Sequence, residues 1–235
     1  MININEIYQL LEDFSNKDQA SGIIAPDVLN RYAPMAQMEV IVAHMNEPEA
    51  YRYGSQAPRK GYESSKAIMD IFSDIKEPFN QSVDSNGYAD QPDDYLYFSS
   101  GIAYSLVSRF GGESKTIARP IEVVRDNELA GKLSSEIEPP SKDYPIITFM
   151  SGKWRVYPFS VTNIEGTYLR EPKTPHWAST TVNNVEVYDA SNSQDFELPL
   201  KMKHDLLYKL CQYIGVRMRE PFLNQVSSQL KRDNV

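Results

Sequence analysis

The side chains that could do chemistry are few and scattered along this sequence. His44, His176 and His204 stand in three different contexts, and none lies at ligand spacing from another His, a Cys or a pair of acids, as a zinc site would require. The single cysteine, Cys211, can form no intramolecular disulfide, and its place on an apolar stripe favours a buried, inert thiol over a nucleophile. The sequence contains neither a G-x-S-x-G elbow nor a phosphate-binding loop. We therefore expect no enzyme activity, no catalytic or metal-binding residue and no cofactor.

Paired acids and interleaved aromatic residues are two further patterns to weigh. Asp93-Asp94 and the Glu136/Glu138 pair offer two carboxylates each, but acids in proline-rich loops are usually solvated, so a glycosidase-type pair is disfavoured. The stretches KWRVYPF and TYLREPKTPHW interleave Trp, Tyr and Arg, which could stack the bases of a single-stranded nucleic acid. Aromatic packing across a half-exposed sheet is favoured over base stacking because the chain is acidic.

The charge of the chain is negative and unevenly distributed. The 235 residues carry a formal net charge of −8, which argues against a general nucleic-acid binder. From Leu200 to the end, seven basic residues stand against three acidic ones, a net of +4, so the rest of the chain carries −8 − 4 = −12. The N-terminus lacks the order of a secretory signal and no apolar run approaches a membrane span. We expect the protein to be synthesised and folded in a cytoplasm and not to associate with a membrane.

The sequence predicts helices at both ends of the chain, and these helices must position the residues discussed above. Five stretches have the apolar spacing of amphipathic helices: residues 4–14, 25–45, 64–79, 199–220 and 222–232. Asn3 or Asn5 could cap the first, Pro34 should kink or split the second, and Pro221 separates the last two. The apolar face of the 199–220 helix cannot stand alone and needs cover from other helices or another copy of the chain.

The sequence pattern in the middle of the chain is typical of a β domain. From Tyr95 onward, short apolar runs are bounded by Gly, Pro, Ser and Asn, which predicts strands, with ELAGKLSS as a short helix between them. The SGK sequence before Trp154 predicts a hairpin turn in which Gly152 supplies the positive φ. We therefore predict an α+β fold in which N- and C-terminal helices form a helical bundle with a β-rich insertion between them. The predicted divisions are 1–82, 83–195 and 196–235.

Taken in order, several segments resemble the head-to-tail connector proteins, or tail adaptor ring proteins, of short-tailed bacteriophages of the crAss-like, podovirus type. The matching segments are INEIYQLLEDFSNKDQASGIIAPDVLNRYAPMAQMEV, QPDDYLYFSS, NELAGKLSSEIEPPSKDYPI, WRVYP, YLREPKTPHW and FELPLKMKHDLLYKLCQYIGVRMREPFLNQ. Their order, rather than any single motif, carries the resemblance, which covers most of the chain except about residues 47–86. The sequence departs from the family pattern at Ser21-Gly22-Ile23 and at Pro34.

The resemblance implies a structural protein of the virion neck or tail, assembled in the host cytoplasm. It implies a ring of about twelve copies below a portal protein, with collar or tail ring proteins as further partners and DNA passing through the lumen without specific binding. The C-terminal segment would dock on the portal or a neighbour through Phe222, Leu223, Gln225, Val226, Gln229, Leu230, Lys231 and Arg232. The inter-subunit or tail-facing β surface would comprise Trp154, Arg155, Tyr157, Tyr168, Arg170 and Trp177. The alternative is a phage accessory protein that binds single-stranded nucleic acid through these aromatic residues.

Overall fold

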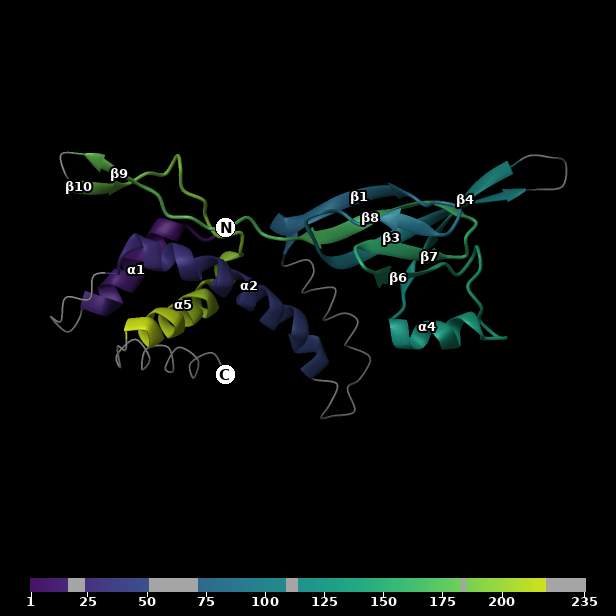
Figure 1. Ribbon diagram of the computed structural model, residues 1–235, viewed down its shortest axis with the longest axis horizontal. Coiled ribbons are helices and arrows are strands. Elements are labelled where there is room, and N and C mark those ends of the chain that lie inside the picture. Colours follow the sequence, from purple (N-terminus) through teal and green to yellow (C-terminus); the bar gives the residue numbers. More distant parts are fainter. Residues whose placement is uncertain (17–23, 51–71, 109–113, 183–184, 219–235) are drawn as a thin grey trace. The chain divides into compact units, whose positions relative to one another are not determined.

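The protein is mixed α+β with a β-rich core (Figure 1). The computed structural model describes residues 1–16, 24–50, 72–108, 114–182 and 185–218. Within these ranges the chain forms four α-helices and ten strands in three sheets. The predicted bundle of N- and C-terminal helices is wrong, because strands outnumber helices, one helix belongs to the β unit, and the terminal helices share their unit with a hairpin and extended segments.

Two compact units divide the chain. Unit 1 comprises residues 1–75 and 172–235, and unit 2 comprises residues 76–171. The sequence-based division places its boundaries after 82 and after 195. Unit 2 begins earlier because Lys76–Ser82 is a strand that pairs along its whole length with Val161–Arg170.

The described residues of unit 1 form three longer helices and a small hairpin. Its elements are α1 (Ile4–Asn16), α2 (Pro26–Ala50), the 3₁₀ turns Ser73–Ile75 and Leu200–Met202, α5 (Lys203–Met218), β9 (Ser179–Val182) and β10 (Val185–Tyr188). The helix α5 packs against both α1 and α2, and its Leu206, Leu210 and Ile214 are fully buried. The apolar stripe predicted for this helix is therefore confirmed as core, although the helix proper starts at Lys203.

The start of α1 is fixed by side chains from both ends of the chain. The Asn3 side chain accepts a hydrogen bond from the Glu6 N–H at 3.0 Å, which confirms the predicted cap, and Asp195 accepts the Ile4 N–H at 2.9 Å. Ile2 and Phe196 exchange backbone hydrogen bonds of 3.2 and 3.1 Å. The segment that precedes α5 is thereby joined to the N-terminus.

Pro34 does not divide the second helix. The helix α2 runs from Pro26 to Ala50 through this proline. A proline in a helix removes the hydrogen bond to the carbonyl four residues earlier, here that of Asn30. Burial of Leu29, Ala33, Ala36, Val40 and Ile41 along one face offsets this loss, so of the two predicted alternatives, a kink or a split, the split is wrong.

Unit 2 consists of two four-stranded sheets. One has the order β1-β8-β3-β4 and the other β2-β7-β6-β5. The strands are β1 (Lys76–Ser82), β2 (Tyr88–Asp90), β3 (Tyr95–Ser108), β4 (Ser114–Pro120), β5 (Glu122–Val123), β6 (Ile146–Met150), β7 (Lys153–Tyr157) and β8 (Val161–Arg170). Both sheets contribute side chains to one core: Phe79, Ala89, Ala103, Ile147, Trp154, Val156, Val161, Ile164 and Tyr168.

A short helix covers part of the second sheet. The helix α4 (Asp126–Leu133) confirms the predicted ELAGKLSS helix. Its Leu129 packs with Val124, Ile146 and Tyr157 in a second, smaller apolar cluster. The face of β7 that carries Tyr157 is therefore partly covered, whereas the opposite face, with Trp154, lies in the main core.

Two local predictions meet different outcomes. The hairpin that joins β6 to β7 is confirmed, since Ser151 and Gly152 have φ of 43° and 74°. The helix predicted over 64–79 is wrong at its end, because Ser73–Ile75 is a 3₁₀ turn and Lys76 begins β1. Residues 64–71 of that prediction, and all of the predicted 222–232 helix, lie outside the described residues.

Candidate functional site

An arginine enclosed by aromatic side chains is the most distinctive polar feature of unit 2. The guanidinium carbon of Arg155 lies 5.1 Å from the centre of the Tyr88 ring, 5.2 Å from that of Tyr157 and 6.0 Å from that of Phe159. The Tyr157 and Phe159 rings also contact each other, with centres 5.2 Å apart. We call Tyr88, Arg155, Tyr157 and Phe159 the Arg155 cluster. Each ring lies within the range of a cation–π interaction.

Strand alternation explains why Arg155 and Tyr157 share a face. Side chains alternate along β7, so Trp154 and Val156 enter the main core while Arg155 and Tyr157 point to the other side of the sheet. Tyr88 of β2 lies directly opposite Arg155 in the antiparallel ladder. Two strands thus hold the first three members of the cluster in register.

Gly87 makes room for the fourth member. It has φ of +83° and accepts the Val156 N–H at 2.8 Å. A Cβ added there would lie 2.6 Å from the Phe159 ring and 2.6 Å from the Val156 carbonyl oxygen. Phe159 remains half exposed, at 50%. The cluster therefore has one open aromatic wall.

The charge of Arg155 has no carboxylate partner in the part of the chain that the structure describes. The acids of neighbouring segments are engaged elsewhere: Asp84 accepts N–H groups of its own turn, Asp90 pairs with a lysine, and Asp126 accepts a threonine hydroxyl at 2.7 Å. The Arg155 Nε is buried without a hydrogen-bond partner. Because the Nε atom is buried, an outside anion would bind the Nη groups of this guanidinium.

Most of the other aromatic residues predicted for this surface are core residues. Trp154, Tyr168 and Trp177 are 0%, 5% and 6% exposed. Trp154 contacts four aromatic rings, with centres 4.6 to 6.4 Å away, and Trp177 lies in unit 1, where its indole N–H donates to Asn5 at 3.0 Å. Trp154 and Tyr168 share the main core of unit 2, and Tyr157, at 8% exposed, is buried as well. Of the predicted set, Arg155 and Tyr157 come together outside that core.

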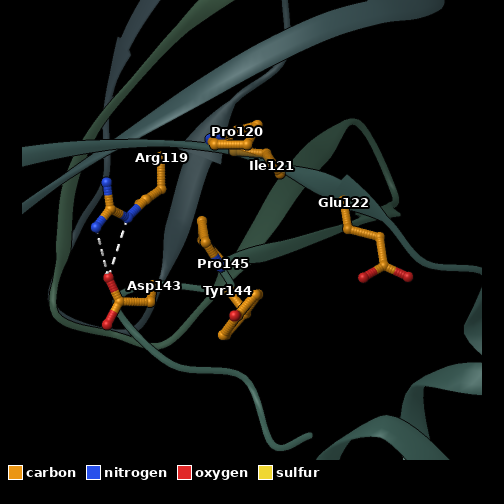
Figure 2. Close-up of a pocket in the computed structure, with 7 residues that line it drawn as sticks. All are labelled: Arg119, Pro120, Ile121, Glu122, Asp143, Tyr144 and Pro145. Carbon is orange, nitrogen blue, oxygen red and sulfur yellow. Dashed lines mark hydrogen bonds and ion pairs between the residues drawn. The ribbon is translucent and has the colours of Figure 1, made fainter.

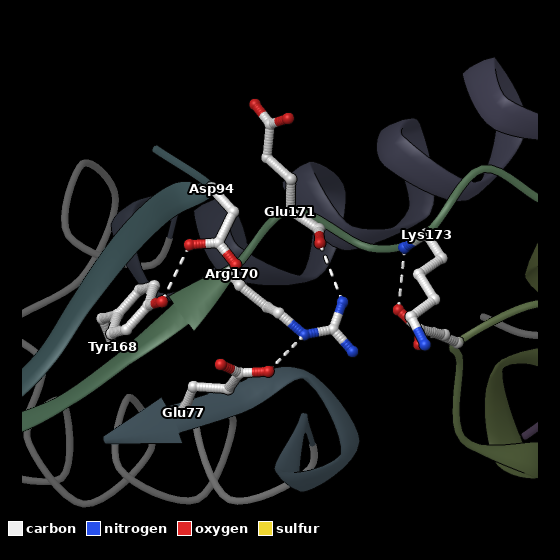
Figure 3. Close-up of polar contacts among 7 residues, drawn as sticks. Glu77, Asp94, Tyr168, Arg170, Glu171 and Lys173 are labelled. Carbon is white, nitrogen blue, oxygen red and sulfur yellow. Dashed lines mark hydrogen bonds and ion pairs between the residues drawn. The ribbon is translucent and has the colours of Figure 1, made fainter. Parts of the chain in front are cut away.

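Arg170, the last predicted member of this surface, sits in a polar network (Figure 3). Its Nε donates to Glu77 at 2.9 Å and its Nη1 to the Glu171 carbonyl oxygen at 2.9 Å. On the same strand, Tyr168 donates to Asp94 at 2.8 Å. Burial, followed by this hydrogen bond to a carboxylate, raises the pKa of Tyr168 to about 12. These contacts fix the ends of β8 and β1 and leave little for a ligand.

Figure 3 also shows a separate contact in unit 1. The backbone N–H of Lys173 donates to the Glu197 carboxylate at 2.8 Å, and its carbonyl oxygen accepts from the Gln37 side chain at 3.0 Å. Gln37 in turn accepts the Glu197 N–H at 3.0 Å. The two buried side chains thus bind an extended segment to α2.

A pocket of about 580 Å³ opens on unit 2 (Figure 2). It is lined by Arg119, Pro120, Ile121, Glu122, Asp143, Tyr144 and Pro145. Arg119 donates to Asp143 from Nε at 3.0 Å and pairs through Nη2 at 2.9 Å, so these charges neutralise each other. Tyr144 is 74% exposed. With two prolines and an isoleucine in its wall, the pocket offers an apolar contact surface.

The remaining candidates can be placed briefly. The eight predicted docking residues between Phe222 and Arg232 lie outside the described residues. Cys211 is fully buried, and burial raises the pKa of its thiol to about 12, so it is a core residue as the sequence indicates. Among the described residues, no group of three or more His, Cys, Asp or Glu side chains could hold a metal ion. None of the described helices combines the length and apolar character needed to span a bilayer.

Sequence reasoning missed Tyr88, and it included Phe159 only within the KWRVYPF stretch without naming it as a site residue. Tyr88 lies too far from Arg155 along the chain to give a periodic signal, and Phe159 reaches the cluster because Gly87 lies under its ring. No protein-family model matches the sequence, and no curated protein is significantly similar to it. The function must therefore be argued from these residues and from the resemblance of the segments.

Proposed function

We propose that the protein is a virion structural protein: a head-to-tail connector that forms a ring assembly, joins the portal to the tail and helps line the DNA channel. The resemblance of the ordered segments quoted above supports this class. The distribution of exposed large hydrophobic side chains supports a structural protein that binds other proteins through its surface. Of eleven in the described residues, seven lie in unit 2: Ile102, Leu106, Val123, Leu133, Ile137, Tyr144 and Phe159.

The composition of unit 2 supports the same proposal. The half-exposed Phe159 of the Arg155 cluster and the Arg155 guanidinium give the mixture of aromatic residues and arginine that dominates the energy of protein interfaces. Residues 76–171 contain fourteen acidic and ten basic residues, a net of −4. An acidic lumen suits a channel because it gives DNA phosphates no foothold.

The proposal is tested with purified chain and purified portal protein. We expect sedimentation and native mass spectrometry to detect a ring of about twelve copies, and a stable complex after mixing with portal rings. Deletion of Phe222–Val235 should abolish portal binding while Trp154 fluorescence, which reports the core of unit 2, stays unchanged. A chain that remains a monomer and never joins a portal would exclude this function, and unchanged binding after the deletion would exclude the docking segment.

A second candidate is an accessory protein that binds single-stranded nucleic acid. The stacking of Arg155 on three aromatic rings favours it, since Arg and aromatic side chains form platforms for bases. Two findings weigh against it: Trp154, Tyr168 and Trp177 are buried, and unit 2 is acidic. Titration with a thymidine oligonucleotide at several salt concentrations decides, because genuine binding should weaken steeply as salt rises.

A further inference from the structure

The loop after α4 presents an isoleucine between two acids. Ile137 is 92% exposed, the largest exposure among the large hydrophobic side chains described. Glu136 and Glu138 flank it, and the Glu138 N–H donates to the Ser135 hydroxyl at 3.1 Å, which shapes the turn. Covering this side chain with an apolar surface of a partner would remove its apolar area from water, which is favourable.

Of the two glutamates, Glu136 is the one available for an outside partner. Lys132, at the end of α4, forms its ion pair with Glu122 at 3.0 Å, and the charge of Glu138 also acts on this lysine. Across the described ranges, neither Glu136 nor Glu138 makes an ion pair, and no hydrogen bond joins this loop to the Arg155 cluster of the same chain. Among the described residues, Arg155 therefore has no carboxylate partner and Glu136 has no cationic partner.

The chemistry of the two features is complementary. The Arg155 cluster offers a guanidinium that contacts aromatic rings but, among the described residues, no carboxylate, and a half-exposed phenylalanine lies beside it. The loop offers a carboxylate beside a fully exposed isoleucine. A guanidinium binds a carboxylate through two parallel hydrogen bonds, and an aliphatic side chain packs well on an aromatic face.

We propose that the Glu136–Glu138 loop of one copy binds the Arg155 cluster of a neighbouring copy. The Glu136 carboxylate accepts hydrogen bonds from the Arg155 guanidinium, and Ile137 packs against Phe159. The contact deepens the proposed function, on which it rests for closure into a ring assembly. It joins two different patches of unit 2, so it repeats head to tail, which is the arrangement that generates closed rings.

A protein carboxylate fits the site better than a nucleic-acid phosphate does. The Arg155 cluster belongs to a unit with a net charge of −4, which repels a long chain of phosphates. A single carboxylate on a projecting loop brings one charge and an apolar side chain, and it requires no wider basic surface.

Charge reversal tests the contact with the full chain as its own probe. R155E leaves an acidic cluster facing an acidic loop, and E136R leaves a basic cluster facing a basic loop, so each variant alone should associate at least about tenfold more weakly than the wild type by sedimentation. A one-to-one mixture of the two variants should associate like the wild type, because every contact in an alternating assembly is again of opposite charge. The matched control is K115E, a charge reversal at an exposed position of β4 in the same unit, which should associate normally.

Several outcomes would overturn the inference. Wild-type association of either single variant, failure of the folded mixture to recover, or a wild type that stays monomeric would each do so. Trp154 fluorescence checks that R155E is folded, and E136R, on an exposed loop, tests the contact from the other side. If R155E loses oligonucleotide binding while association is unchanged, the cluster serves nucleic acid instead. Portal binding is measured separately. If the wild type forms normal portal complexes while both variants associate like the wild type, only the proposed contact is excluded. If the chain associates with itself but forms no portal complex, the proposed function is excluded.

Discussion

Substitution of Gly166 by alanine should destabilise unit 2 severely, because the two central strands of its larger sheet touch at this glycine. Gly166 of β8 lies opposite Gly101 of β3 on one side and Phe79 of β1 on the other. A Cβ at Gly166 would lie 2.0 Å from the Ser100 carbonyl oxygen and 2.7 Å from the Gly101 Cα. Ordinary contacts between such atoms are about 3.5 Å. The obstructing atoms are backbone, so they cannot rotate away.

The magnitude follows from what must move. Overpacking a core usually costs about 1–3 kcal/mol, and here relief requires displacing the main chain of β3, so we expect a loss of about 3–5 kcal/mol. Domains are stable by only about 5–15 kcal/mol. For a unit of this size, each kcal/mol corresponds to about 4–8 °C in Tm. The substitution should therefore lower the Tm of unit 2 by at least about 12 °C.

The assay uses the location of the two tryptophans, one in each unit. In a Trp177→Phe background, Trp154 alone reports the unfolding of unit 2 in urea. Gly131→Ala is the matched control, because a Cβ there meets nothing within 4 Å and alanine favours the helix α4. The control should be neutral or more stable by up to about 1 kcal/mol. If Gly166→Ala unfolds within about 1 kcal/mol of its background, the close approach of β3 and β8 is not as described.

Two further substitutions test unit 1. Burial would raise the pKa of Glu39, but hydrogen bonds from Lys209 and Tyr213 and the charge of Lys209 lower it overall. The ionised carboxylate therefore stabilises the folded state at pH values above its unfolded pKa near 4.5. This contribution to stability is lost as the pH falls through the lower pKa of the folded state. Urea unfolding should show wild type losing more stability than E39Q on acidification, and equal losses would contradict this. Leu207→Asp, at a position 7% exposed, should lower the free energy of unfolding by about 3–5 kcal/mol, as measured by thermal unfolding. The control, Gln212→Asp on the exposed face of α5, should be nearly neutral. Similar losses of stability for both variants would place Leu207 outside the core.

The sequence predicts elements well where local chemistry alone decides them. Positive φ at Gly152 follows from a turn that favours glycine, and the apolar stripe of α5 follows from three- and four-residue spacing. The helix predicted over 64–79 is wrong at its end because Ile75 and Phe79 keep a helical spacing while belonging to a turn and a strand. Pro78 is tolerated within β1 because β1 is an edge strand of its sheet.

The arrangement of the helices could not be predicted from their stripes. An apolar stripe states that a face is covered, but not by what, and in unit 1 part of the cover comes from Ile2, Trp177 and Phe196, which lie outside the helices. The aromatic residues present the same difficulty. The sequence shows that aromatic residues and arginine are interleaved in KWRVYPF. Only the alternation of side chains along β7 in the structure shows that Trp154 is buried and that Arg155 is partly exposed.

The most direct test of the central proposal is the mass and symmetry of the particle formed with portal protein. Native mass spectrometry followed by cryo-microscopy of the mixture measures both. The proposed function predicts a closed ring of about twelve copies seated on the portal, with a continuous central channel. Portal rings that retain their unbound mass in the presence of excess chain would contradict it.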